Sequence, residues 1–146
     1  MDQTEGSIVI DAPPEDVMEV IEDYESYPAW AEVNTVDVRR RGEGGRALEV
    51  HFEVDVPVLG KASYTLAYIY DPGDLGVSWT TKEAHGAVRD VRGEYLLAEV
   101  EDDRTKVTYR LGVELGPLVP GFIRSEGERR VIENALERLK RRVERG

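Results

Sequence analysis

The sequence predicts an α+β fold in which a curved antiparallel sheet packs its concave face against one long C-terminal helix. Three observations favour this class. Residues from about Arg39 to Leu115 read as consecutive β-strands. Within them, the stretch from Arg46 to Val56 alternates strictly between apolar and polar residues. The segment from Leu115 to Gly146 contains the one long helix that the sequence offers. Because the apolar stripe of that helix must be buried, we expect it to cover the sheet and to enclose a pocket.

The composition is typical of a globular protein, and we expect a single domain over residues 1–146. Hydrophobic residues make up 40% and charged residues 34% of the chain, which indicates neither disorder nor a membrane span. The formal net charge of −11 disfavours nucleic-acid binding and leaves binding to a basic protein open. The absence of cysteine excludes disulfides and thiolate sites. Residues 1–16 are acidic and lack the pattern of a signal peptide, so a cytoplasmic location and no stable membrane insertion are expected.

The N-terminal elements are predicted in the order strand, helix, short helix. Gly6 to Asp11 is rich in β-branched residues and predicts a strand. Pro13 and Pro14 suit the first turn of a helix. The apolar face of this helix is formed by Val17, Met18, Val20 and Ile21. Because Tyr27 precedes a proline, the helix cannot continue cleanly, and a short second helix or turn is expected around Ser26 to Trp30.

Six further strands are predicted. The first runs from Val33 to Arg41, followed by Arg46 to Val56 and Lys61 to Tyr70. Asp71-Pro72-Gly73-Asp74 is a turn by composition. The last three strands are recognised by apolar residues that share one face, namely Val77 and Trp79, then Val91, Tyr95 and Leu97, then Val107, Tyr109, Leu111 and Val113.

The long helix has an inner face that changes character along its length. Its apolar stripe is formed by Val131, Ile132, Ala135, Leu136, Leu139 and Val143. Continued toward the N-terminus, the stripe meets Gly121, Ser125 and Glu128, with Arg124 near its edge. A carboxylate on a buried face should be paired, protonated or wetted by a cavity, so this polar half is where we expect the ligand. In the alternative, the helix kinks near Gly127 and Glu128 reaches solvent or Arg124.

Aromatic residues dominate the predicted inner face of the sheet. They either form an ordinary core or line a cavity. Several of them are tyrosines, and each buried hydroxyl needs a hydrogen-bond partner, which water or a ligand in a cavity would supply. The predicted ligand-binding residues are Trp30, Phe52, Tyr64, Tyr68, Trp79, Tyr95, Tyr109, Phe122, Ser125 and Glu128.

Other candidate sites are weaker. His51, Glu53 and Asp55 share the face of their strand opposite the apolar residues and are interpreted as surface residues, not as a metal site. His85 lies beside Gly86 in an expected hairpin and is interpreted as an ordinary loop histidine. The sequence contains no GxSxG, phosphate-loop or HExxH motif, and we expect no metal and no cofactor.

Five segments together resemble a known superfamily. They are Ile8 to Pro13, Asp23 to Trp30, Arg92 to Leu97, Arg104 to Tyr109 and the closing helix. In this order they resemble the START/Bet v 1-like (SRPBCC) superfamily, and within it the polyketide cyclase/dehydrase and coenzyme Q-binding group. The resemblance implies a helix-grip fold: a seven-stranded antiparallel sheet around the C-terminal helix, two short helices after the first strand, and a cavity for a hydrophobic or aromatic small molecule.

Three functions remain open at this point. The first hypothesis is binding or transport of a lipid, quinone or polyketide-like molecule. The second is a polyketide aromatase/cyclase or dehydrase, in which tyrosines, Arg124 or Glu128 would move protons. The third is a ribosome- or protein-associated regulatory module, a role that the resemblance also allows. The segment from Leu115 to Ile123 would be either a lid hinge or a rigid connection. Both a monomer and a homodimer are compatible with the sequence.

Overall fold

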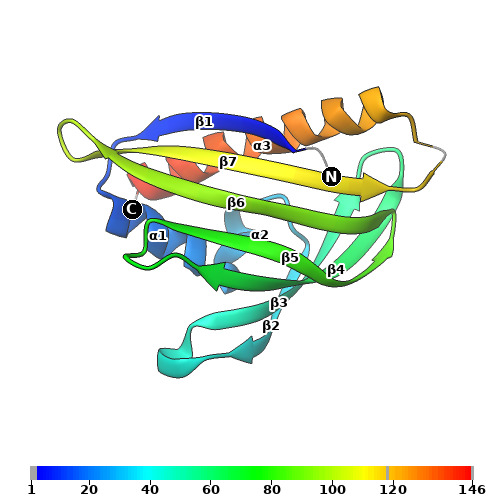
Figure 1. Ribbon diagram of the computed structural model, residues 1–146, viewed down its shortest axis with the longest axis horizontal. Coiled ribbons are helices and arrows are strands. Elements are labelled where there is room, and N and C mark those ends of the chain that lie inside the picture. Colours follow the sequence, from blue (N-terminus) through cyan, green and yellow to red (C-terminus); the bar gives the residue numbers. More distant parts are fainter. Residues whose placement is uncertain (1–2, 118, 146) are drawn as a thin grey trace.

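The computed structural model describes residues 3–117 and 119–145, and its centre is one curved antiparallel sheet (Figure 1). The order of the seven strands across the sheet is β1-β7-β6-β5-β4-β3-β2. Every pair of neighbouring strands is antiparallel. The strands are β1 (Thr4–Ile10), β2 (Thr35–Arg41), β3 (Ala47–Val56), β4 (Gly60–Tyr70), β5 (Gly76–Gly86), β6 (Val88–Val100) and β7 (Arg104–Leu115).

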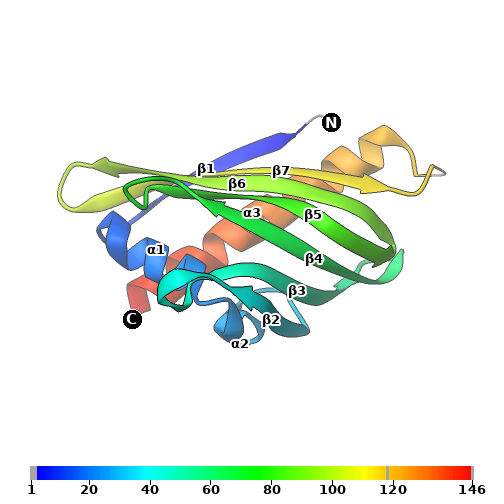
Figure 2. The same ribbon diagram turned by 60° about the horizontal axis from the view of Figure 1, so that its bottom comes forward.

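The helices lie on the concave side of the sheet (Figure 2). They are α1 (Pro14–Glu22), a 3₁₀ turn (Tyr24–Ser26), α2 (Tyr27–Trp30) and α3 (Gly121–Arg145). Pro14 occupies the first turn of α1, where its missing N–H costs nothing. The predicted helix-grip arrangement is confirmed, including the two short helices after the first strand.

The starts of two predicted strands were wrong by two residues each. The first strand begins at Thr4 instead of Gly6, because its pairing with β7 extends to Leu111. The second strand begins at Thr35 instead of Val33, because the Val33 N–H bonds the Ala31 carbonyl in a tight turn after α2. The alternative with a helix kink near Gly127 is not observed, since α3 is continuous from Gly121 to Arg145.

From Ile132 onward, α3 contributes fully buried side chains to the core. Within the sheet, α3 packs against β1 and β7. The residues that carry this packing, Ile132, Leu136 and Leu139, are at most 3% exposed. A Cβ atom added to Gly6 of β1 would lie 2.6 Å from the Cγ2 atom of Ile132. Glycine is therefore needed for the close approach of strand and helix.

The connection from β7 to α3 runs from Gly116 to Pro120. Leu118, which belongs to the predicted hinge segment, lies outside the described residues. Among the described helices, none is both long and apolar enough to cross a membrane.

Candidate functional site

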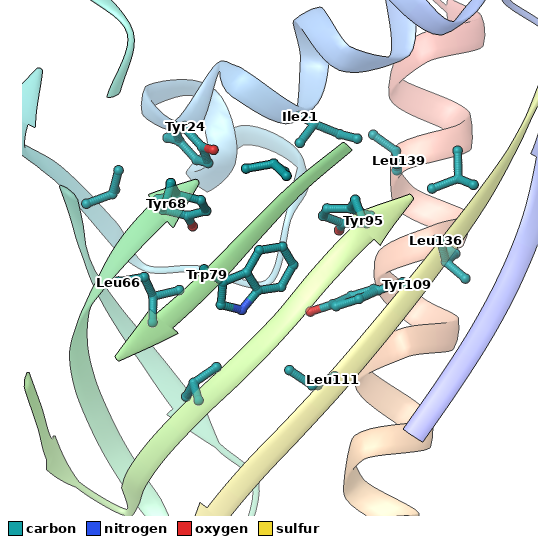
Figure 3. Packing of buried hydrophobic residues seen from close by; sticks show 14 of the residues in the cluster. Ile21, Tyr24, Leu66, Tyr68, Trp79, Tyr95, Tyr109, Leu111, Leu136 and Leu139 are labelled. Atoms are coloured by element: carbon teal, nitrogen blue, oxygen red, sulfur yellow. The ribbon is translucent and has the colours of Figure 1, made fainter. Parts of the chain in front are cut away.

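A row of aromatic side chains crosses the concave face of the sheet. Tyr68, Trp79, Tyr95 and Tyr109 come from β4, β5, β6 and β7 and lie side by side (Figure 3). The centroids of neighbouring rings are 5.9 Å apart for Tyr68 and Trp79, 5.5 Å for Trp79 and Tyr95, and 4.6 Å for Tyr95 and Tyr109. Gly93 pairs with Trp79 across the strands, and a Cβ there would lie 2.7 Å from the indole ring. Glycine at position 93 therefore leaves room for the indole ring of Trp79 between its neighbours in the row.

A second aromatic group continues the row toward α2. Phe52 and Tyr64 lie on paired positions of β3 and β4, with ring centroids 5.9 Å apart. Tyr27 of α2 lies 6.1 Å from Phe52 and 5.1 Å from Trp30, again between centroids. Tyr24 joins the two groups, because its ring centroid is 4.6 Å from that of Tyr68. The interior beneath β3 to β7 is therefore largely aromatic.

The tyrosines of this interior fall into two classes by their hydroxyl groups. Tyr27 donates to the Ile21 carbonyl at 2.6 Å, Tyr70 donates to the Ala47 carbonyl at 2.6 Å, and the hydroxyls of Tyr24 and Tyr70 are 3.0 Å apart. The hydroxyls of Tyr64, Tyr68, Tyr95 and Tyr109 form no hydrogen bond to any described residue.

None of these four free hydroxyls is sealed from a water-sized molecule. Among the described residues, the only fully buried polar side-chain atom without a partner is Nε1 of Trp30. Yet the Tyr68, Tyr95 and Tyr109 side chains are each only 8% exposed. Each hydroxyl therefore keeps some access to a water-sized molecule, so that water or a ligand atom could accept or donate a hydrogen bond there.

Burial keeps these phenols protonated. It raises the pKa of Tyr64 to about 12. Burial, reinforced by neighbouring phenols, raises the pKa of Tyr68, Tyr95 and Tyr109 well above the ordinary value of 10.0. At neutral pH these groups are neutral hydrogen-bond donors that can also accept, and they are not bases.

Glu128 connects the polar half of α3 to the sheet. Its carboxylate accepts hydrogen bonds from the Thr4 hydroxyl at 2.8 Å, the Val113 N–H at 2.7 Å and the Arg124 guanidinium at 3.0 Å. The residue is 3% exposed, which agrees with its predicted place on the buried face. Its pairing with Arg124 was foreseen only in the kinked alternative, whereas the structure achieves it in a straight helix. The contacts make Glu128 a clamp between α3, β1 and β7.

The remaining predicted site residues are more dispersed. Ser125 and Trp30 are half-buried. Phe122 is 76% exposed and does not line the interior, because it lies in the first turn of α3, ahead of the turn that Glu128 fixes to the sheet. Sequence reasoning missed Tyr24, Tyr27 and Tyr70, although Tyr24 and Tyr27 belong to one of the segments that carried the family resemblance.

The polar side chains of β3 bond to neighbouring strands and are not clustered. His51 Nδ1 lies 2.9 Å from the Thr65 hydroxyl, and Glu53 accepts from the Thr35 hydroxyl. His85 lies 3.9 Å from Glu83 and is exposed. Within residues 3–117 and 119–145, no three His, Asp or Glu side chains gather as metal ligands would.

Two open hollows lie on the surface, away from the aromatic row. One is at the β6–β7 turn and has a volume of about 660 Å³. The other lies between α1 and the β4–β5 turn, with a volume of about 430 Å³. It is lined by Glu15, Met18, Glu19, Glu22, Asp23 and Asp74. Neither hollow contains a residue predicted to bind the ligand.

A curved antiparallel sheet around a long C-terminal helix is the helix-grip fold, and the chain has structural neighbours in the START/SRPBCC superfamily. The chain belongs to the family described as polyketide cyclase / dehydrase and lipid transport, whose pattern it matches over residues 1–144. A comparison with curated proteins finds no match.

Several solved structures share the fold. A START superfamily protein from Mycobacterium smegmatis is 19% identical, with a TM-score of 0.89 over 98% of this chain and 97% of that one. A protein from Thermus thermophilus is 23% identical, with a TM-score of 0.81 over 99% and 98%. The Zhui aromatase/cyclase from Streptomyces is 21% identical, with a TM-score of 0.78 over 99% and 94%. At these identities the likeness concerns the fold.

Proposed function

We propose that this protein binds a hydrophobic small molecule, such as a lipid, a quinone or a polyketide-like compound, between the sheet and α3. The observation that carries the proposal is the group of four tyrosine hydroxyls without described partners, set among apolar and aromatic surfaces. An interior that served packing alone would use phenylalanine at these positions, because a phenol without a partner costs free energy when it is buried. Family membership supports the same function.

The side chains of the interior favour particular classes of ligand. Flat rings favour a conjugated or aromatic molecule that can stack on Trp79 and Tyr95. Neutral phenols favour oxygen acceptors such as ketones, quinone carbonyls or esters. The Trp30 Nε1–H is a further donor without a described partner. In this proposal Glu128 and Ser125 bound the polar end of the site.

Native mass spectrometry of gently purified protein tests the proposal. We expect a bound molecule that organic solvent extracts and that fluorescent lipid or quinone probes displace. Replacing Tyr95 and Tyr109 together by phenylalanine should weaken probe binding by about tenfold, since two hydrogen bonds are lost. Tyr70→Phe is the matched control, because its hydroxyl already bonds the Ala47 carbonyl and the change should leave probe affinity unchanged. A protein that purifies empty and binds no probe would contradict the proposal.

A second candidate is aromatase/cyclase chemistry, which the likeness to the Zhui aromatase/cyclase favours. The interior would fold a reactive chain into a productive geometry, and the protonated phenols would donate to developing enolates. Arg124 and Glu128 are the other proton-moving candidates. Incubation with a poly-β-ketone should give product patterns that change when Tyr109 or Arg124 is replaced. Unchanged products would remove these residues from the chemistry.

A further inference from the structure

A short segment closes the side of the interior that the long helix leaves uncovered. The strand β2 forms one edge of the sheet, whereas α3 packs against β1 and β7 at the other edge. Between them lie α2, which contacts both β2 and α3, and the linker that follows it (Figure 2). We call residues 28–33 of this segment the flap. Its Trp30 and Val33 side chains pack against the hydrophobic core, so the flap covers the interior on the side of β2.

The flap is attached at its two ends, and its own side chains are not deeply packed. At one end, the Tyr27 hydroxyl donates to the Ile21 carbonyl at 2.6 Å. At the other end, the Asn34 N–H donates to the Glu53 carbonyl at 2.8 Å. No residue of the flap itself is fully buried. Because segments with few buried apolar contacts open at a low cost in free energy, the flap can move while its two ends stay fixed.

Two side chains of α3 fasten the flap in its closed position. Arg138 Nη1 donates to the Trp30 carbonyl at 3.2 Å, and Arg138 Nε lies 3.5 Å from a carboxylate oxygen of Glu32. Asn134 Nδ2 donates to the same carboxylate oxygen at 3.1 Å. The Arg138 and Glu32 side chains are 44% and 58% exposed, and ion pairs between exposed side chains stabilise a structure only weakly. The fastening is therefore easily broken.

The closed position also contains an unsatisfied hydrogen-bond donor. Nε1 of Trp30 is fully buried and bonds to no described residue. A buried donor that has lost its water partner costs free energy, and opening the flap would recover that cost. A ligand oxygen that accepts a hydrogen bond from this N–H could do so in the closed position without that cost. Binding of such a ligand would therefore shift the flap toward its closed position.

We propose that the flap is a hinged lid, which opens to admit a ligand to the aromatic interior and is held closed by α3 and by the bound ligand. The inference rests on the proposed function, because it names the route into the same interior. Neither of the two surface hollows is lined by a residue of the aromatic row, so neither supplies that route. The attachments at Tyr27 and Asn34 act as the hinges.

Hydrogen exchange of the ligand-free protein tests the lid directly. The Ala31 N–H bonds the Tyr27 carbonyl at 2.7 Å and the Val33 N–H bonds the Ala31 carbonyl at 2.9 Å, so both amides report opening. Arg138→Ala should raise their exchange rates about fivefold, because both contacts of Arg138 with the flap are lost. Arg142→Ala, at an exposed position of the same helix, is the matched control and should leave these rates unchanged. Exchange as slow as that of the β3 amides, or unchanged by Arg138→Ala, would overturn the proposal.

Cross-linking tests whether opening controls ligand entry. The chain contains no cysteine, so Glu32→Cys and Asn134→Cys introduce the only two thiols, one on each side of the fastening. A short bismaleimide that joins them should slow both association and dissociation of a quinone probe by about tenfold or more, because a closed lid blocks passage. The same variant capped with N-ethylmaleimide should exchange the probe at least as fast as the wild type. Equal rates for the linked and the capped protein would overturn the proposal.

A second cross-link controls for the reagent. Glu126→Cys and Arg130→Cys lie at exposed positions of α3, and joining them should leave the probe rates unchanged. The two experiments also separate the lid from the proposed function. Faster exchange in Arg138→Ala without binding of any probe would support the lid and contradict the proposed function. Slow exchange, together with probe binding that the flap cross-link does not affect, would support the proposed function and overturn the lid.

Discussion

The two regions beneath the sheet differ in whether their side chains carry polar groups without described partners. Against β1 and β7, α3 packs Ile132 so closely that Gly6 admits no Cβ. Beneath β4 to β7, the three tyrosines of the aromatic row (Figure 3) and the neighbouring Tyr64 have hydroxyls without described partners. Both regions are buried, and in both a glycine makes room for a neighbouring side chain, but only the second contains hydroxyls without described partners. The free energy of unfolding should therefore fall when an aliphatic side chain is truncated. It should also fall at a pH where the phenols of the aromatic region would ionise in the unfolded chain.

The largest expected effect is alkaline destabilisation through the aromatic region. Tyr27, Tyr68, Tyr95 and Tyr109 have folded-state pKa values well above 10.0, mainly because burial disfavours the phenolate. Below pH 10 both folded and unfolded chains are protonated, so their stabilising contribution is fully present. Above pH 10 the unfolded chain loses these protons first, and stability falls by at most about 1.4 kcal/mol per phenol per pH unit.

Urea unfolding at pH 8, 10 and 11 measures this loss, which should reach about 5 kcal/mol one unit above pH 10 for four phenols. Tyrosinate absorbance should rise together with unfolding. If the folded protein shows tyrosinate absorbance near pH 10 with unchanged stability, the hydroxyls are solvated and the interior is open to bulk water.

The next largest effect should come from the aliphatic region. Leu139 is 0% exposed, and Leu139→Ala should lower the free energy of unfolding by about 3 kcal/mol, because the close-packed site cannot collapse around the cavity. Val131→Ala on the same helix is the control, since Val131 is 49% exposed and its loss should cost less than about 1 kcal/mol. Chemical denaturation of both variants measures the difference. Equal losses in the free energy of unfolding for the two variants would show that Leu139 is not closely packed.

The sequence predicted the helices and strands well, but it predicted the contacts between them less well. Strict alternation identified β3 within one residue of its start, since Val50 and Phe52 on its apolar face are buried while Glu53 and Asp55 on its polar face are exposed. The inner position of Glu128 also followed from helical periodicity. Its partners could not be foreseen, because Thr4 is 124 positions away along the chain and Val113 offers a backbone N–H that carries no sequence signal.

The sequence also could not show which tyrosine hydroxyls are paired and which are free. Alternation places Tyr68 and Tyr70 on the same face of β4. Only the fold brings Tyr24 to Tyr70, so that one hydroxyl is satisfied while its neighbour on β4 is not. Periodicity reports which way a side chain points, whereas hydrogen bonding depends on which element arrives opposite it.

Breaking the Glu128 clamp between α3, β1 and β7 should have an intermediate effect. Glu128→Gln removes a charge that accepts three hydrogen bonds and leaves Arg124 without its carboxylate. We expect a loss of about 2 kcal/mol in the free energy of unfolding, because a donor amide cannot replace an acceptor beside the Val113 N–H. Glu126→Gln, on the exposed face of the same turn, should change stability by less than about 0.5 kcal/mol. Thermal unfolding of the two variants at one pH decides the matter, and equal melting temperatures would show that the clamp contributes nothing.

The smallest expected effect on stability comes from removing single tyrosine hydroxyls, and it tests directly whether unpaired and paired hydroxyls differ. Tyr95→Phe removes a hydroxyl with no described partner, so the free energy of unfolding should stay within about 0.5 kcal/mol or rise. Tyr70→Phe removes a hydroxyl that donates to the Ala47 carbonyl, and should cost about 1 kcal/mol. Urea denaturation of the two variants gives both values. A larger loss for Tyr95→Phe than for Tyr70→Phe would mean that the Tyr95 hydroxyl is satisfied within the protein, and it would remove this residue from the set left free for a ligand.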